Sequence, residues 1–459
     1  MRRPERAVAM ITLALLNVFL VAAALAVVKV TPDRSLALQP PTVAARMIMP
    51  PGSPALAPLA TTAPLPASGP LAARLAGPMR ASDLGTDLTG AVIDAATGRK
   101  LFGSHADQPA VPASTTKLTT ATAVLASAGP DHRITTKVVR SGNTVTIVGG
   151  GDPTLTTSAS KSAYPRPASL TDLAKQTAAA LKAAGVRKVT VDYDTSAYQG
   201  SRSGPNWKPV YFAEGDVAPV SALELDAGRM APGAQDRVAD PPALVASAFS
   251  LLLDKRGVTA DVGTRTTAPR GAQRIGAVQS PPISALVERM LTDSDNDIAE
   301  AMSRQVAMKL GRPPTFEGGG DAVHQVLASL GLAAGIDTVD GSGLSPLNRI
   351  TPNALARLLA FDGSSAEHPE LRTVMSGMPI AGFSGTLSDR YSGTAADGKG
   401  VIRAKTGTLN GVNTLAGTVV DADGRLLTFA FMANRVRSPT ATLAALDSLA
   451  AILAGCGCR

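Results

Sequence analysis

Ser114 and Lys117 stand three residues apart, which is the spacing of a nucleophile and its base on one turn of a helix. They lie at the start of an Ala-, Thr- and Leu-rich segment that predicts a helix to about Ser127. A serine there lies near free backbone N–H groups and the positive end of the helix dipole. A buried lysine, or one beside another cation, loses its proton near neutral pH. The pair therefore fits nucleophilic catalysis, although the Ser-x-x-Lys spacing alone is common by chance and also fits a serine that simply caps the helix.

A second polar cluster, Ser294, Asp295 and Asn296, falls between two predicted helices, residues 282–290 and a helix that ends near residue 310. Short polar side chains at such a corner favour a cleft over a buried core. The alternative is that Ser294 or Asn296 only caps the second helix.

A third cluster, Lys405, Thr406, Gly407 and Thr408, follows a short strand-like run and precedes a predicted hairpin, residues 413–421 and 425–434. The cluster is therefore expected on a strand or at its end. Gly407 removes a side chain where another backbone or a ligand must approach closely.

The order Ser-x-x-Lys, Ser-Asp-Asn, Lys-Thr-Gly is the motif set of serine β-lactamases and penicillin-binding proteins. From about residue 80 to 455 the chain resembles the class C low-molecular-mass penicillin-binding proteins, the D-alanyl-D-alanine carboxypeptidase/endopeptidase family. Residues 149–155, 340–352 and 385–387 resemble further signatures of that family. The resemblance implies an α/β (α+β) fold, the transpeptidase fold shared by penicillin-binding proteins and serine β-lactamases.

The resemblance also implies roles for the three clusters. Ser114 would attack the carbonyl of a D-Ala-D-Ala bond and form an acyl-enzyme, while Lys117 takes its proton. Ser294 would relay a proton to the leaving amine, with Lys405 tuning it electrostatically. Two lysines near one serine would help to keep one of them neutral.

The remaining residues would hold the substrate. Asn296 would bind the amide side of the peptide, and Thr406 and Thr408 its terminal carboxylate. The oxyanion would rest on the backbone N–H groups of Ser114 and Thr408. The predicted substrate-binding set is Asn296, Lys405, Thr406, Gly407 and Thr408.

The implied partners are peptidoglycan stem peptides, with β-lactam antibiotics as covalent inhibitors. The expected reaction is cleavage of the terminal D-Ala-D-Ala bond. Cleavage of D-Ala-meso-diaminopimelate cross-links is the open alternative, and the sequence does not decide the balance between the two. No cofactor and no metal ion are expected.

The sequence disfavours three rival functions. A class A β-lactamase needs a glutamate for its deacylating water, and none lies between Gly318 and Ala366. A Ser-His-Asp hydrolase is disfavoured because the chain has four histidines and no Gly-x-Ser-x-Gly motif. A non-catalytic peptidoglycan-binding protein would not need the intact Ser114 and Lys117 pair.

The N-terminal segment predicts export. Arg2, Arg3 and Arg6 precede an apolar run, residues 7–28, long enough as a helix to span a bilayer core. The arginines favour a cytoplasmic N-terminus with the rest outside the cell membrane. Residues 1–30 are therefore interpreted as an uncleaved anchor, with a cleaved signal as the alternative. Residues 31–78, rich in Pro and Ala, predict an extended linker.

The globular part is expected in three pieces. Residues 79–134 and 281–455 form the catalytic domain, and residues 135–280 form one inserted α+β domain. The net charge of +8 permits an anionic partner such as a membrane surface, but no nucleic-acid motif is present and no nucleic-acid partner is predicted. Cys456 and Cys458 are too few and too close for a zinc site and are interpreted as thiols of a disordered tail.

Overall fold

The computed structural model describes residues 63–157 and 163–457, which all belong to one compact unit, Leu59–Arg459. The predicted anchor or signal, residues 1–30, and most of the predicted linker lie outside the described residues. Within the described ranges no helix has both the length and the apolar character needed to cross a bilayer. The predictions on the N-terminal segment therefore stay predictions.

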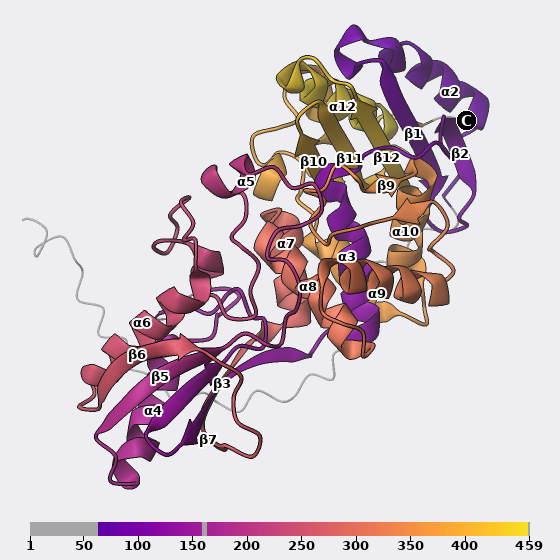
Figure 1. The fold of residues 1–459 in the computed structure, drawn as a ribbon. Coiled ribbons are helices and arrows are strands. Elements are labelled where there is room, and N and C mark those ends of the chain that lie inside the picture. The colour runs from indigo at the N-terminus through magenta and orange to yellow at the C-terminus, as the bar shows by residue number, and fades with distance from the viewer. Residues whose placement is uncertain (1–62, 158–162, 458–459) are drawn as a thin grey trace, which may run out of the picture. The chain divides into compact units, whose positions relative to one another are not determined.

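The first sheet joins the two ends of the described chain, because β1 lies beside β12 (Figure 1). Its strand order is β10-β11-β12-β1-β2, and every neighbouring pair is antiparallel. The strands are β1 (Asp87–Asp94), β2 (Lys100–Ser104), β10 (Ile402–Leu409), β11 (Val412–Val420) and β12 (Leu426–Asn434). β11 is buried along nearly its whole length, as expected for an inner strand covered on both faces.

One apolar cluster of this sheet includes α12 (Pro439–Ala454) and α2 (Ser68–Ala76). In Figure 1, α12 lies across the strands near β11 and β12. The prediction of a linker up to residue 78 is wrong for α2. Leu71 and Leu75 are four residues apart, so they share one helix face, and both are fully buried in the cluster.

A second cluster packs helices from both halves of the catalytic part against the sheet residues Ala416, Ala430 and Met432. These helices are α3 (Thr116–Ala128), α7 (Ile283–Thr292), α8 (Asn296–Lys309), α9 (Phe316–Ser329), α10 (Pro352–Ser364) and α11 (Arg372–Gly377). α3 packs on α8, so the start of α3 and the corner before α8 come from neighbouring helices. The first two predicted motifs are thereby brought together.

α9 begins at Phe316 although glycine, which disfavours helices, occupies three positions of its first turns. The reason is close packing at three consecutive glycines, residues 318–320. A Cβ atom on Gly319 would lie 2.5 Å from Ser303 Oγ, and one on Gly320 would lie 2.5 Å from the Thr338 carbonyl oxygen. Tertiary packing thus outweighs the poor helix propensity of glycine.

The second sheet has the strand order β6-β5-β4-β3-β7. Its strands are β3 (Arg133–Ser141), β4 (Thr144–Val148), β5 (Lys188–Asp194), β6 (Thr259–Arg265) and β7 (Gln273–Pro282). β4, β5 and β6 are parallel, and the other pairs are antiparallel. α4 (Leu170–Ala183) and α6 (Pro241–Asp254) pack with this sheet in a separate apolar cluster that contains Leu173, Val191 and Phe249.

This second sheet arises from the stretch predicted as the inserted domain, residues 135–280. β6 and β7 are the edge strands of this sheet; β6 is mostly exposed, and β7 mixes exposed and buried positions without clean apolar alternation. Edge strands with polar, exposed faces give a weak strand signal.

The stretch between β5 and α6 packs against the catalytic part. It contains α5 (Val210–Ala213), and its Trp207, Tyr211 and Val217 are buried together with Phe316 of α9 and Leu344. Part of the predicted insertion therefore borders the region of the predicted cleft. We call residues 195–240 the bridging segment.

The remaining described elements are short. They are β8 (Ile336–Asp337), β9 (Arg349–Ile350), and the 3-10 turns η1 (Pro78–Arg80), η2 (Ser82–Leu84), η3 (Ala113–Thr115), η4 (Asp226–Gly228), η5 (Pro369–Leu371), η6 (Gly385–Leu387) and η7 (Gly393–Gly398).

Cys456 corrects the interpretation of the C-terminus as a thiol-bearing tail. It is fully buried in the cluster around α12 and is disulfide-bonded. Cys458 lies outside the described residues. The prediction of a disordered tail is wrong for Cys456, because this residue, two positions after the end of α12, still packs in the apolar cluster.

Candidate active site

Ser114 lies on η3, the single turn that leads directly into α3, as predicted. Ala113 has φ 49°, in the left-handed region that non-glycine residues rarely adopt. The turn is held from outside by Thr414 of β11, whose Oγ1 donates to the Pro112 carbonyl oxygen at 2.7 Å. Gly343 lets a loop pass beside it, because a Cβ there would lie 1.9 Å from the Ala113 carbonyl oxygen.

The Lys117 ammonium group is fully buried and meets three acceptors. Its Nζ lies 3.0 Å from Ser114 Oγ, 2.6 Å from Asn296 Oδ1 and 2.7 Å from the Ser342 carbonyl oxygen. Burial lowers the pKa of Lys117 to about 8, against the opposing attraction of Asp340 and Glu300. A lysine with this pKa is partly neutral near physiological pH, so it can accept a proton from Ser114.

The turn between α7 and α8 presents Ser294 and Asn296. Ser294 has φ 58°, and the N-cap of α8 is Asp295, whose side chain accepts from the Ile298 N–H at 2.9 Å. The alternative that Ser294 or Asn296 only caps the helix is therefore wrong. Because Asp295 takes that role, the other two side chains are left to face the Lys117 and Lys405 amines.

Lys405, on β10, completes the cluster around Ser294. Its Nζ donates to Ser294 Oγ at 2.8 Å and to the Thr406 carbonyl oxygen at 2.7 Å. The side chain is fully buried. Burial first, and then the neighbouring charges of Lys117 and Arg390, lower the pKa of Lys405 well below its usual range.

Gly407 is required by close packing, as its type predicts. A Cβ atom there would lie 2.1 Å from Thr414 Oγ1, 2.7 Å from the Pro112 carbonyl oxygen and 3.0 Å from the Ser114 backbone nitrogen. β10 therefore passes directly along the turn that carries Ser114. The close approach brings Thr406 and Thr408 to the same region.

Two further hydroxyl groups line β10. Thr408 is exposed, and its Oγ1 accepts from Asn413 Nδ2 at 3.3 Å. Thr406 Oγ1 lies 2.9 Å from Thr386 Oγ1. Sequence reasoning did not assign Thr386, although residues 385–387 stood out as a family-like signature.

The loop after β8 supplies the Ser342 carbonyl that sequence reasoning missed. Glu300 of α8 accepts from the Gly341 and Ser342 N–H groups at 3.1 and 2.9 Å. Asp340 accepts from the Gly343 and Ser345 N–H groups at 2.8 and 2.6 Å. These buried carboxylates fix the loop, and the loop places the carbonyl against Lys117 Nζ.

The bridging segment also touches the site. Asn296 Nδ2 donates to the Asp216 carbonyl oxygen at 2.9 Å, which orients the amide so that its oxygen faces Lys117. Trp207 Nε1 donates to Asp340 Oδ2 at 2.8 Å. Neither contact could be found from residue types, since one acceptor is a backbone carbonyl and the other partner lies 133 positions away.

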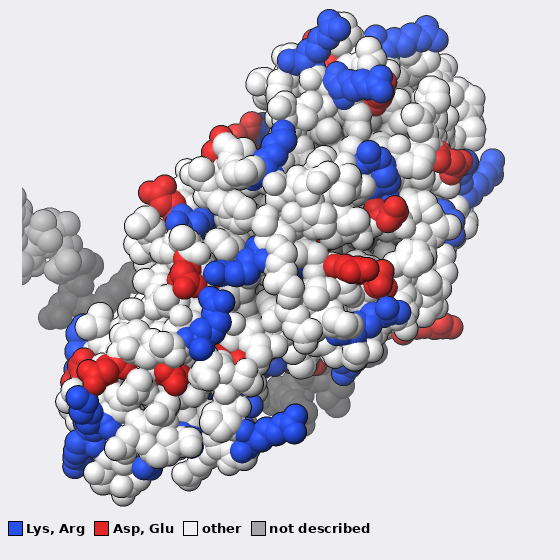
Figure 2. All heavy atoms as spheres, in the orientation of Figure 1, with Lys and Arg blue, Asp and Glu red and all other residues white. Residues whose placement is uncertain are grey.

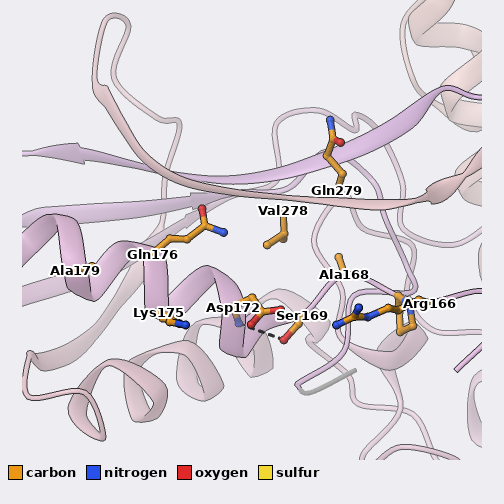
Figure 3. Close-up of a pocket in the computed structure, with 10 residues that line it drawn as sticks. Arg166, Ala168, Ser169, Asp172, Lys175, Gln176, Ala179, Val278 and Gln279 are labelled. Atoms are coloured by element: carbon orange, nitrogen blue, oxygen red, sulfur yellow. Dashed lines mark hydrogen bonds between the residues drawn. The ribbon is translucent and has the colours of Figure 1, made fainter. Parts of the chain in front are cut away.

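A separate pocket of about 650 Å³ lies beside α4 and β7 (Figure 3). Lys175, Gln176 and Gln279 line it, and its dashed hydrogen bond is the Ser169 cap of α4 accepting from the Asp172 N–H at 3.2 Å. None of the predicted site residues lines this pocket. It lies in the inserted part and is distinct from the cluster around Ser114.

The cluster is arranged for acyl transfer. A partly exposed serine hydroxyl meets a buried amine with a lowered pKa, a second hydroxyl meets a second buried amine, and a strand with two threonines runs alongside. Hydrogen bonds connect Lys117 with Ser114 and Asn296, and Lys405 with Ser294. The other predicted site residues, Thr406, Gly407 and Thr408, follow Lys405 on β10. In the described residues, no group of three or more His, Cys, Asp or Glu side chains is arranged to hold a metal ion.

The chain is similar in sequence to several carboxypeptidases. The model of the D-Ala-D-Ala carboxypeptidase 3 (S13) family matches residues 71–237 and 233–455. The carboxypeptidase DacB of Mycolicibacterium smegmatis is 40% identical over 419 residues, which are 88% of each chain. A D-alanyl-D-alanine carboxypeptidase of Actinomadura sp. is 29% identical over 454 residues, covering 79% of this chain and 80% of that one.

A solved structure confirms the predicted fold. Penicillin binding protein 4 from Haemophilus influenzae superposes with a TM-score of 0.68 at 21% identity, covering 83% of this chain and 97% of that chain. The same protein has been solved in complex with a β-lactam.

Proposed function

The chain belongs to the D-Ala-D-Ala carboxypeptidase 3 (S13) family, and we propose that it is a serine carboxypeptidase that removes the terminal D-alanine of peptidoglycan stem peptides. The observation that carries the proposal is the position of Lys117 Nζ, buried between Ser114 Oγ, Asn296 Oδ1 and the Ser342 carbonyl oxygen.

The first half of the reaction forms the acyl-enzyme. Neutral Lys117 takes the Ser114 proton across 3.0 Å while Oγ attacks the carbonyl of the D-Ala-D-Ala bond. The negative charge on that carbonyl oxygen is stabilised by backbone N–H groups, for which Ser114 and Thr408 are the predicted donors. The bond to the terminal D-alanine then breaks, its amine takes the hydroxyl proton of Ser294, and the proton that Lys117 took from Ser114 replaces it on Ser294.

Lys405 serves the leaving group and the substrate carboxylate. Lys405 Nζ donates to Ser294 Oγ at 2.8 Å. The Ser294 hydroxyl is therefore free to donate its own proton to the leaving amine. A carboxylate nearby favours the charged form of a lysine, so the carboxylate of the terminal D-alanine would favour protonated Lys405. Thr406 and Thr408 on β10 are the predicted hydrogen-bond donors to that carboxylate. Water then attacks the acyl-enzyme and releases the shortened peptide.

β-Lactams fit the same cleft as covalent inhibitors. Their ring amide and carboxylate present the groups that the cleft would bind in a D-Ala-D-Ala terminus. The sequence lacks the glutamate that a class A β-lactamase uses to hydrolyse such an adduct, so the acyl-enzyme should persist.

The test is digestion of purified stem pentapeptide and of a cross-linked muropeptide dimer, with the products identified by mass. We expect release of D-alanine from the pentapeptide, and its loss in Ser114→Ala. Ser247→Ala, an exposed serine on α6, should retain activity. Splitting of the dimer would add the D-Ala-meso-diaminopimelate endopeptidase reaction, whereas release of D-alanine by Ser114→Ala would refute the proposal.

We also propose that the protein acts outside the cytoplasm, attached through residues 1–30 as an anchor or exported by them as a cleaved signal. The arginine cluster before the apolar run supports this. Reporter fusions after about residue 78, with and without residues 1–30, test it. A membrane-free cytoplasmic pool of the full chain would contradict it.

A further inference from the structure

A small cavity lies where the bridging segment meets α8. It measures about 140 Å³, and Tyr198, Arg202, Ser221, Arg265 and Arg304 are among the residues that line it. One water takes up about 30 Å³ in the liquid, so the cavity has room for a small oxyanion. We call the three arginines and the space between them the arginine pocket.

Arg304 is the buried wall of the arginine pocket. Its side chain is 1% exposed, and its Nη1 donates to Glu300 Oε2 at 3.0 Å and to the Glu300 carbonyl oxygen at 3.1 Å. Its guanidinium carbon lies 4.0 Å from the Phe316 ring centroid. Nη2 is buried and has no hydrogen-bond partner among the described residues. A buried charged donor without an acceptor is costly, and Arg304 is among the residues that line the cavity.

Arg202 and Arg265 form the outer wall of the arginine pocket. In the part of the chain that the structure describes, their two positive charges face only one paired carboxylate. They share Asp240, at 3.4 Å each, and that carboxylate is 45% exposed. Arg202 Nε is also buried and has no hydrogen-bond partner within the described ranges. Burial, and then the charge of Asp297, raise the pKa of the nearby Glu224 well above its usual range.

We propose that the arginine pocket binds one oxyanion group, a carboxylate or a phosphate, at a site separate from the catalytic cleft. Guanidinium groups match both chemistries through paired N–H donors. Three elements supply the donors: the bridging segment, the end of β6, and α8. A bound oxyanion would join the inserted part to the catalytic part through charge-assisted hydrogen bonds.

Two sources could supply the group. One is a free anion such as inorganic phosphate. The other is a stem-peptide carboxylate beyond the cleaved end, which would make the arginine pocket a second contact for the polymer; this source rests on the proposed function. Anion binding itself does not rest on the proposed function, because it is measured without turnover.

The experiment uses thermal unfolding of the full chain with inorganic phosphate, at ionic strength held constant with chloride. We expect a saturable rise in the midpoint. The double variant Arg202→Gln/Arg265→Gln should need more phosphate to reach half of the maximal rise in midpoint. We expect that concentration to increase at least about tenfold, which corresponds to about 1.4 kcal/mol of binding free energy. Both arginines are partly exposed, so the variant should fold; the single variant Arg265→Gln, with retained β-lactam labelling, guards against misfolding. Arg274→Gln, exposed on β7, is the control.

Arg304 is left intact because Glu300, its partner, holds the loop beside Lys117. A stem peptide with free carboxylates, and the same peptide with its carboxylates amidated, are then added to Ser114→Ala as competitors of phosphate. Competition by the free form alone identifies a peptidoglycan carboxylate as the occupant, and no competition identifies a free anion. A wild-type midpoint that phosphate raises no more than chloride does, or equal phosphate curves for wild type and the double variant, would overturn the proposal.

Discussion

At the scale of single residues, the two buried lysines divide the work because their surroundings differ. Lys117 faces three acceptors and feels the carboxylates of Asp340 and Glu300, which moderate the effect of burial. The neighbours of Lys405 include the cations Lys117 and Arg390, and their charges lower its pKa in the same direction as burial does. Both arrangements hold an amine within hydrogen-bond reach of a hydroxyl, as general acid–base chemistry requires.

Lys117→Arg should abolish acylation although the positive charge is kept. Arginine does not give up its proton near neutral pH, so the base is lost, and the acylation rate with a β-lactam should fall at least about 100-fold. Stopped-flow acylation measures this, with Lys175→Arg on the exposed face of α4 as the control. Near wild-type acylation by Lys117→Arg would show that Lys117 is only an ion-pair partner.

The acylation rate should rise with pH and level off above about 8. The lowered pKa of Lys117, about 8, means that its protonated form, which cannot act as a base, dominates at lower pH. Raising the pH increases the neutral fraction of Lys117, so the acylation rate increases with it. Acylation by a β-lactam that does not titrate between pH 6 and 9 gives the profile. A rate that is flat or falls over this range would contradict the assignment.

At the scale of secondary-structure elements, the sequence places the first two motifs at helix starts and the third on a strand, as the structure has them. The start of α3, the α7–α8 corner and β10 all follow from local patterns. The supporting acceptors did not, because the carbonyls of Ser342 and Asp216 carry no residue-type signal. α2 was missed since its short apolar face lies in a Pro- and Ala-rich stretch.

Gly407→Ala should separate β10 from the turn that carries Ser114. The new Cβ would overlap Thr414 Oγ1 and the Pro112 carbonyl oxygen, and over-packing of this kind costs about 1–3 kcal/mol. We expect a lower free energy of unfolding in urea and a slower acylation rate. Gly69→Ala is the control, because nothing lies within 4 Å of a Cβ there; equal behaviour of the two variants would contradict the close approach.

At the scale of the whole molecule, the inserted part is not a separate attachment. The bridging segment touches Asn296 and Asp340, so residues 135–280 contribute to the site as well as to the second sheet. Figure 2 shows acidic and basic side chains interspersed over the face in view, without one continuous field of either sign. The contacts of the bridging segment with Asn296 and Asp340 cannot be predicted from local patterns, because the residues of the bridging segment that make them carry no sequence signal.

Trp207→Phe should slow acylation while leaving the fold intact. Phenylalanine keeps the ring packing on Phe316 but loses the hydrogen bond to Asp340, which helps to fix the loop that carries the Ser342 carbonyl. Loss of such a buried bond costs about 1–3 kcal/mol. Acylation kinetics and urea unfolding are compared with Tyr193→Phe on β5. An unchanged acylation rate would mean that the bridging segment does not support the site.

The central claim is that Ser114 is the nucleophile of a penicillin-binding carboxypeptidase. The most direct measurement is labelling with a fluorescent penicillin, followed by protease digestion and mass analysis of the labelled peptide. We predict one covalent adduct on Ser114, absent in Ser114→Ala and retained in Ser247→Ala. An adduct on any other residue, or undiminished labelling of Ser114→Ala, would contradict the account.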